Sequence, residues 1–291
     1  MSSVPYDVIA TSKPIRFRVG PDQKEFFIHD ELVARMSKPL RTLVQGEWKE
    51  KNEGLVEWSE IDEETFVRFC EFAYTGNYQP AKPQPPKVEN KESAAPMEPG
   101  TQPEYLVAED YAVQIEEPEV VVEEAPQDIW GTNPYPTKGK KKYSNRSRKD
   151  IMLSDFQNAL DITSASTSSE PPMNPLADYS EVLLSHARLY ALADCYDVDQ
   201  LMSLCVRKLH HTLRGFDLHG GARVTDVAQL IDFSYKNTRS GSAQQDKLRN
   251  LLSMYVACYI EELWPNLYFR DVIEYGEISK DIIGKLLRRL D

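Results

Sequence analysis

The sequence lacks the short motifs that mark the common catalytic sites. It contains no glycine-rich phosphate loop, no Gly-x-Ser-x-Gly elbow and no His-Glu-x-x-His motif. Its carboxylates are numerous, but they stand at expected helix starts and in a polar central stretch, so no nucleophile, base and orienting residue are predicted to meet. We therefore expect no catalytic residues, no cofactor and no enzymatic activity.

Cysteine is scarce and its spacing is not that of a metal or redox site. The chain has four cysteines, none in a Cys-x-x-Cys pair: Cys70, Cys195, Cys205 and Cys258. Each stands among apolar residues in a helical pattern, which predicts buried, reduced thiols and an intracellular protein. The one sequence cluster that combines cysteine with histidine is Cys205, His210, His211 and His219. Its spacing matches no zinc pattern, so we expect no metal site.

Long apolar runs and excess positive charge are also missing. No apolar stretch approaches the roughly 20 residues that span a bilayer, and residues 1–14 contain no apolar segment of a secretory signal. The 291 residues carry a formal net charge of −12, which argues against direct binding to nucleic acid or to anionic membranes. An intracellular location is expected, and the choice between nucleus and cytoplasm stays open.

Proline is concentrated in one part of the chain. Of the 19 prolines, 14 fall between Pro80 and Pro175. This stretch cannot bury enough apolar surface to offset its chain entropy, so we predict a disordered insertion or linker there. The predicted organisation is a first domain part over 1–79, the insertion over 80–175, closing helices over 176–214 and a helical extension over 215–291.

Charge is segregated inside the insertion. Residues 104–128 hold nine acidic and no basic residues, interleaved with apolar ones, a pattern compatible with ordering on a partner. Residues 138–149 hold seven basic residues, which indicate a nuclear import signal or a nucleic-acid tail. Mutual attraction of the two blocks is the other interpretation. The basic residues are Lys138, Lys140, Lys141, Lys142, Arg146, Arg148 and Lys149. Residues 150–160 are partly periodic and are compatible with a short helix.

The first domain part alternates and then turns helical. Residues 15–19 alternate apolar and basic side chains, and residues 25–28 follow after a turn, so a hairpin is predicted. A third strand is expected over 55–58. Asp62 is a predicted N-cap of the next helix, and Gly76 is its predicted left-handed C-cap.

In this order the segments resemble a known family. The patterns FxIHxxLVxRxS over 26–37 and DEETFxRFxEFAYTGxY over 62–78 are similar to the BTB/POZ domain, in the form common in fungal proteins. The pattern LLxHAxLYxLADxYxVxxLxxLCxxKLHxTL over 183–213 resembles the closing helices of the same module. The resemblance implies an α+β fold, a small three-stranded sheet covered by helices, here interrupted by the insertion and followed by an all-α extension.

The last part reads as helical throughout. Val227, Leu230, Ile231 and Tyr235 form one stripe, and Asp246 is the predicted cap of a long helix that Pro265 ends. Ser279 is the predicted cap of a final helix with Ile283, Leu286, Leu287 and Leu290 on its apolar face. This part resembles a short version of the helical extension called BACK.

The resemblance implies a protein that binds other proteins. Family members form homo- or hetero-oligomers, and some bind the cullin scaffolds of ubiquitin ligases. Dimers of the family bury the first helix, so the candidate interface here is Leu32, Val33, Met36 and Leu40. Two alternatives stay open: a nuclear, transcription-associated regulator that uses the charged insertion, and a substrate adaptor of a cullin-type ligase.

Overall fold

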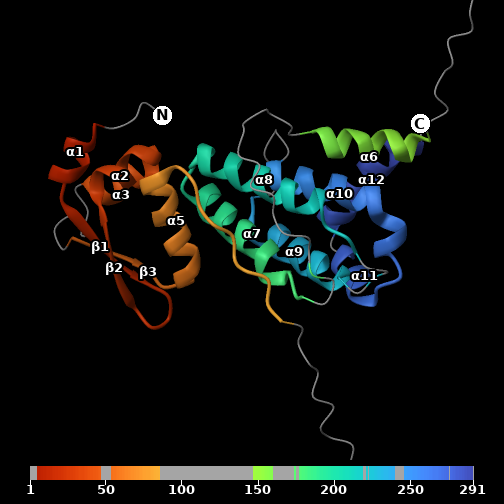
Figure 1. Ribbon diagram of the computed structural model, residues 1–291, viewed down its shortest axis with the longest axis horizontal. Coiled ribbons are helices and arrows are strands. Elements are labelled where there is room, and N and C mark those ends of the chain that lie inside the picture. The colour runs from red at the N-terminus through yellow and green to blue at the C-terminus, as the bar shows by residue number, and fades with distance from the viewer. Residues whose placement is uncertain are drawn as a thin grey trace, which may run out of the picture. The chain divides into compact units, whose positions relative to one another are not determined.

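A small sheet and a larger set of helices make up the folded part of the chain (Figure 1). The computed structural model describes residues 5–46, 54–85, 147–159, 174, 177–218, 221, 223–239, 246–274 and 276–290. All of them belong to one compact unit. The acidic block over 104–128 and most of the basic segment over 138–149 lie outside the described residues.

The three predicted strands are confirmed, and they form one sheet in the order β2-β1-β3. Strand β1 (Pro14–Val19) pairs antiparallel with β2 (Lys24–His29) and parallel with β3 (Leu55–Trp58). The alternation seen in the sequence has a simple cause. Every second residue of β1, namely Ile15, Phe17 and Val19, is buried against helices on one side of the sheet.

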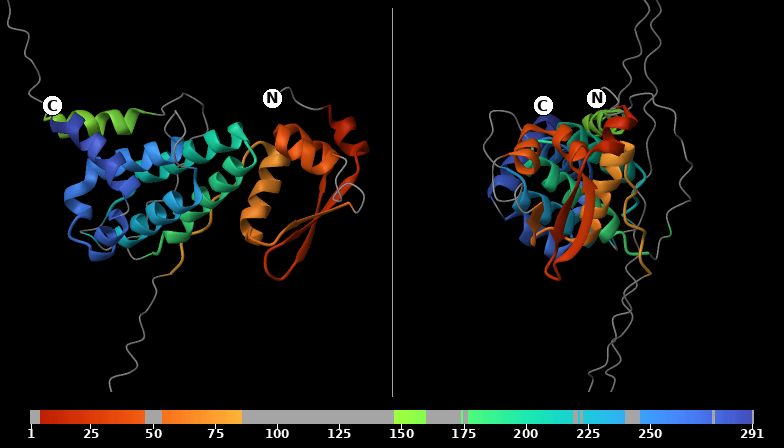
Figure 2. Two further views of the ribbon diagram at one scale, coloured as in Figure 1. Left: turned by 180° about the vertical axis from the view of Figure 1, so that it is seen from behind. Right: turned by 90° about the vertical axis from the view of Figure 1, so that its left-hand side faces the viewer.

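Among the described residues, the helices beside the sheet are α1 (Tyr6–Thr11), α2 (Asp30–Met36), α3 (Lys38–Gln45) and α5 (Glu63–Thr75). The predicted caps of α5 are confirmed. The Asp62 carboxylate accepts a hydrogen bond from the Thr65 amide at 2.8 Å, and Gly76 has a φ of 72°. Phe66 of α5 packs on Phe17 and Phe26, so α5 covers the sheet on the side that faces the second half of the chain (Figure 2).

The described residues of the second half form these helices: α7 (Ser180–Cys195), α8 (Asp199–Arg214), α9 (Val224–Asn237), α10 (Lys247–Leu263), α11 (Leu267–Ile273) and α12 (Gly276–Leu290). Asp246 caps α10 as predicted, with its carboxylate accepting from the Arg249 amide at 2.9 Å. Helix α7 is buried on nearly all sides, because α5, α8 and α9 all pack against it.

The final helix departs from its prediction in two ways. It begins at Gly276, and Ser279 lies inside it with its hydroxyl donating to the Ile273 carbonyl, so Ser279 is not the cap. The predicted apolar face is wrong in part. Leu286 packs against the core as predicted, but Ile283 and Leu287 are exposed, and Ile278 and Ile282 are buried instead. Apolar residues extend about half-way around this helix, so contacts with the other helices decide which of them face the core.

A helix lies within the stretch predicted to be a disordered insertion. Residues Arg148–Asn158 form α6, whose start has a reciprocal cap between Ser147 and Asp150. Met152 and Phe156 are buried, and Phe156 packs on the rings of His210 and Tyr255. The short helix that the periodicity of residues 150–160 allowed is therefore present, within a stretch otherwise predicted to be a disordered insertion, because two apolar anchors and a capped start dock it on α8 and α10. The described residues contain no helix long and apolar enough to cross a membrane.

Two glycines in different backbone conformations give a matched stability test. An added Cβ meets nothing within 4 Å at either Gly76 or Gly284. Gly76→Ala is expected to lower the free energy of unfolding by about 1 kcal/mol, because alanine resists the left-handed conformation. Gly284→Ala, in the middle of α12, is expected to raise it by about 0.8 kcal/mol. Urea unfolding of both variants checks this, and effects of equal sign would contradict the assigned cap.

Candidate functional site

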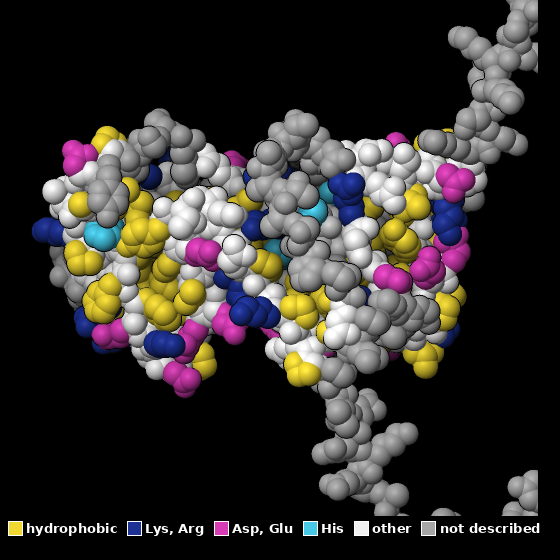
Figure 3. Space-filling view, in the orientation of Figure 1, with side chains coloured by type: hydrophobic (Ala, Val, Ile, Leu, Met, Phe, Trp, Pro, Cys, Tyr) yellow, Lys and Arg dark blue, Asp and Glu magenta, His cyan; other side chains and the backbone are white. Residues whose placement is uncertain are grey.

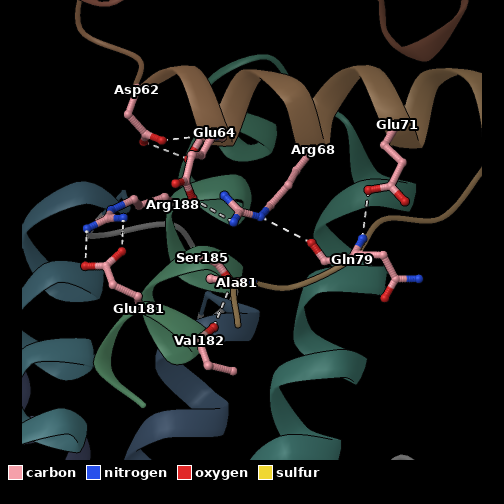
Figure 4. A network of polar contacts seen from close by, with 11 residues as sticks. Asp62, Glu64, Arg68, Glu71, Gln79, Ala81, Glu181, Val182, Ser185 and Arg188 are labelled. Carbon is pink, nitrogen blue, oxygen red and sulfur yellow. Dashed lines mark hydrogen bonds and ion pairs between the residues drawn. The ribbon is translucent and has the colours of Figure 1, made fainter. Parts of the chain in front are cut away.

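The chain segment that leaves α5 lies directly on α7, and this junction joins the two sequence halves (Figure 4). The Ala81 amide donates to the Ser185 hydroxyl at 3.2 Å, and that hydroxyl donates to the Val182 carbonyl at 2.7 Å. Further along, Gln84 and Asp178 exchange two backbone hydrogen bonds. The segment between α5 and the insertion is thus held on the start of α7.

Arg68 fixes the course of this segment from the α5 side. Its Nε donates to the Gln79 carbonyl at 3.2 Å, and its guanidinium also contacts the Glu64 carboxylate at 2.9 Å (Figure 4). The Glu71 carboxylate accepts from the Gln79 amide at 2.8 Å. Because Glu64 is largely exposed, its ion pair adds little free energy. The bonds to Gln79 are the ones that position the backbone.

Arg188 supplies the charge on the α7 side of the junction. It makes a two-pronged contact with Glu181, at 2.7 and 3.2 Å. Burial opposes its charge, but the hydrogen bonds to Glu181 and the nearby carboxylates of Asp62 and Glu64 together raise the pKa of Arg188. The positive charge of α7 therefore faces the acidic start of α5.

A buried polar cluster lies beneath the junction. Tyr78, fully buried, places its hydroxyl 2.7 Å from Nδ1 of His186 on α7. Lys208 of α8 donates to the Tyr78 carbonyl at 2.6 Å, and its ammonium lies 4.8 Å from the centre of the Tyr78 ring. Cys205 of α8 lies beside the same hydroxyl. One tyrosine thus links residues more than a hundred positions away on two helices.

The reactive groups of this cluster are held in unreactive forms. Burial raises the pKa of the Cys205 thiol to about 12, so it stays protonated at neutral pH and is a poor nucleophile. Burial, together with the charges of Lys208 and Arg68, lowers the pKa of His186 to about 3. The cluster is therefore suited to joining elements rather than to acid–base chemistry at neutral pH.

The predicted interface residues do not form a surface patch. Leu32, Val33 and Leu40 are buried in the chain's own core, and Met36 is half-buried against it. The sequence showed more apolar residues than one stripe requires. In the structure α2 and α3 use that surplus to contact each other as well as the sheet. The exposed patch on which the dimer prediction rested is therefore absent from these residues.

The basic segment is described only at its end. Arg148 and Lys149 belong to α6, and Lys149 forms an ion pair with Glu261 of α10 at 3.2 Å. The other five basic residues, Lys138, Lys140, Lys141, Lys142 and Arg146, lie outside the described residues. The import hypothesis stays a prediction, with its two last residues in a folded helix.

Of the predicted group of Cys205, His210, His211 and His219, the structure describes all but His219. Within the described part of the chain, no group of three or more His, Cys, Asp or Glu side chains is placed to hold a metal ion. Nε2 of His210 is 2.6 Å from the Phe156 carbonyl, while Cys205 faces Tyr78. Cys195 is exposed, which corrects the prediction that all four cysteines are buried.

A pocket of about 200 Å³ lies where the end of α9 meets the start of α12. Its lining is Asp232, Tyr235, Lys236, Gly276, Glu277 and Ile278. The charged groups there already have protein partners: Lys236 pairs with Asp232 at 2.8 Å, and Glu277 pairs with Arg249 at 2.7 Å. Arg249 is itself buried, with further bonds to Thr238, so this region clamps three helices together.

Several large apolar side chains that sequence reasoning missed are exposed. Figure 3 shows hydrophobic side chains gathered over α5 and the neighbouring sheet. The exposed residues are Val8 on α1; Phe27 on β2; Val67 and Tyr74 on α5; Ile151 on α6; the corner group of Trp264, Leu267 and Tyr268 between α10 and α11; and Ile283 and Leu287 on α12. The corner group carried a local signal, since Pro265 and the Asn266 cap force a turn between apolar residues.

No family model and no curated protein matches the chain.

Because the junction consists of contacts between distant segments, the two halves should assemble without a covalent link. We expect residues 1–85 and 146–291, produced as separate chains, to co-purify. Tyr78→Ala is expected to prevent this, since loss of a buried tyrosine costs about 3 kcal/mol or more. Tyr74→Ala, which removes an exposed tyrosine of α5, is the matched control and should co-purify. Equal behaviour of the two variants would contradict the central role of Tyr78.

The buried histidine predicts acid sensitivity. Burial lowers the folded-state pKa of His186 from 6.5 to about 3. Between these two values the unfolded chain binds the proton and the folded chain does not, so the free energy of unfolding decreases as the pH decreases. Between pH 7 and pH 5 this group should lower the free energy of unfolding by about 2 kcal/mol. Urea unfolding of the wild type and His186→Asn at both pH values measures it. The same pH slope in both proteins would contradict the assignment.

Proposed function

We propose that the protein is a non-enzymatic protein–protein interaction module. The observation that carries this proposal is the corner between α10 and α11. There Leu267 is 70 % exposed and Trp264 is 53 % exposed, and Tyr268 stands beside them. Contiguous apolar groups of this size on a folded surface are typical of places where other proteins bind.

The corner is held in one conformation. The Asn266 side chain accepts from the Phe269 amide at 3.0 Å and so caps α11. Phe269 and Val272 are buried on the inner face of α11, which turns Leu267 and Tyr268 outward. A preformed corner loses little conformational entropy on binding, which favours its use as an anchor.

The charged residues around the corner indicate the chemistry of the partner segment. Glu262, Asp271 and Glu274 are exposed on the neighbouring turns. An acidic rim around tryptophan and tyrosine suits a partner segment with an apolar anchor and flanking lysine or arginine, which also stack on aromatic faces. The BTB/POZ resemblance supports the same proposal, since domains of that family act by binding other proteins.

Removal of the corner should abolish partner binding without unfolding the protein. We expect the double variant Trp264→Glu and Leu267→Glu to lose at least about tenfold in recovery of bound partner, because single anchors carry about 1–2 kcal/mol or more. Affinity purification from the native cell, followed by mass spectrometry, compares the variant with the wild type. Lys280→Glu, an exposed polar change on α12, is the control. Unchanged partners in the double variant would contradict the proposal.

A further inference from the structure

Strand β2 is an edge strand, and among the described residues no other strand pairs with its outer side. The Arg16 amide donates to the Gly54 carbonyl, so even-numbered residues of β1 face β3. The Asp30 amide donates to the Lys13 carbonyl, so odd-numbered residues on the β1 side face β2. With the observed register, the even-numbered residues of β2 therefore bond to β1. The backbone groups that point away from the sheet are those of Glu25, Phe27 and His29.

The outward backbone groups of Glu25 and Phe27 are available for pairing, because no group among the described residues bonds to them. The His29 amide contacts the Tyr74 hydroxyl at 3.4 Å and would exchange that contact for one with a paired strand. The Phe27 side chain is 64 % exposed. Proteins usually protect such an edge with a charge or a proline at its centre, whereas here the centre is phenylalanine.

We propose that β2 pairs antiparallel with β2 of a second copy of this chain, about a two-fold axis at Phe27. The two three-stranded sheets would then form one continuous sheet. This surface shares no residue with the corner between α10 and α11. Failure of this proposal would therefore leave the proposed function untouched, and the reverse also holds.

The sequence of the strand selects the second copy as the occupant. Residues 24–30 read Lys-Glu-Phe-Phe-Ile-His-Asp, which is complementary to itself when reversed about Phe27. Phe27 meets the partner's Phe27, and Glu25 meets the partner's His29. Lys24 meets the partner's Asp30. Opposite charges and aromatic pairs across antiparallel strands are the stabilising combinations.

Other registers lose this match. Moving the axis to Glu25 places two glutamates opposite each other, and a parallel, in-register pair places Lys24 beside the partner's Lys24. Like charges directly opposite destabilise a pair of strands. Glu25 already contacts Arg16 and Arg18 at 3.4 and 3.2 Å, but these groups are substantially exposed and their contacts are weak. The charges therefore select the register, and the backbone bonds with Phe27 provide the affinity.

Side chains of α5 contact both ends of β2, so the conformation of the edge strand is already fixed before pairing. Lys24 pairs with Glu63 at 2.5 Å, and Nδ1 of His29 is 2.8 Å from the Tyr74 hydroxyl. Pairing along one seven-residue edge buries less than the about 1,200 Å² of a standard interface, so we expect a weak dimer that forms at micromolar concentration or above.

Sedimentation equilibrium of the full chain over a range of micromolar concentrations tests the dimer. The wild type should show a concentration-dependent dimer. Phe27→Pro should be monomeric, because its missing amide hydrogen pointed outward and the bonds between β1 and β2 stay intact. Phe27→Lys should also be monomeric, because it places two lysines opposite each other. It serves as the second test if the proline variant does not fold. Leu267→Lys is the control, with similar exposure elsewhere, and should still dimerise.

Disulfide trapping tests the register. Phe27→Cys, in a Cys195→Ser background that removes the exposed native thiol, should cross-link to a second copy under mild oxidation. Cα atoms of directly opposed strand residues are about 5.5 Å apart, within the range that a disulfide spans. Leu267→Cys in the same background should not cross-link. A strictly monomeric wild type, an undiminished dimer in Phe27→Lys, or cross-linking at Leu267→Cys alone would overturn the proposal.

Discussion

The burial of helix α7 is the constraint on which the rest of the structure depends. Its inner surface needs α5 on one side and α8 and α9 on the others, so neither half of the sequence can complete a core alone. Trp58 of β3 stacks on Tyr196 at the end of α7, which extends the same contact to the sheet. The polar junction above Tyr78 then fixes how the halves meet, because each buried donor there needs its own acceptor.

Much of the local structure could be predicted from the sequence, because its causes are local. The alternation of Ile15, Phe17 and Val19 identified a strand with one buried face, and Asp62, Gly76 and Asp246 marked helix ends through their own hydrogen bonds and φ preferences. The order of the strands in the sheet was not predicted. No local rule states which strand lies in the centre, because strand pairing depends on the packing of distant segments.

The candidate site could not be predicted, because exposure is decided by distant segments. Leu32 and Val33 of α2 and Leu40 of α3 are predicted to be a surface surplus, but the two helices pack against each other and all three residues are buried. In α12, Lys285 is buried beside the α10 side chain of Asn250, whereas Ile283 faces outward. Helix α6 carries only two buried anchors, and its place is set by His210 and Tyr255 from elsewhere in the chain. Sequence patterns report which residues are apolar, and tertiary contacts decide which of these are covered.

The bridge between Gln84 and Asp178 has a consequence for how this chain tolerates change. It brings together two positions that are 94 residues apart in the sequence, at the edge of the folded unit. When the fold fixes both ends of a chain segment, the free-energy cost of closing it grows only with the logarithm of its length, so a doubling costs about 0.6 kcal/mol. A change in the number of residues between Pro85 and Ser147 should therefore alter the free energy of unfolding little, because the contacts of Gln84 and of α6 are made by residues outside that stretch. The chain can thus change in length here while the core contacts stay the same.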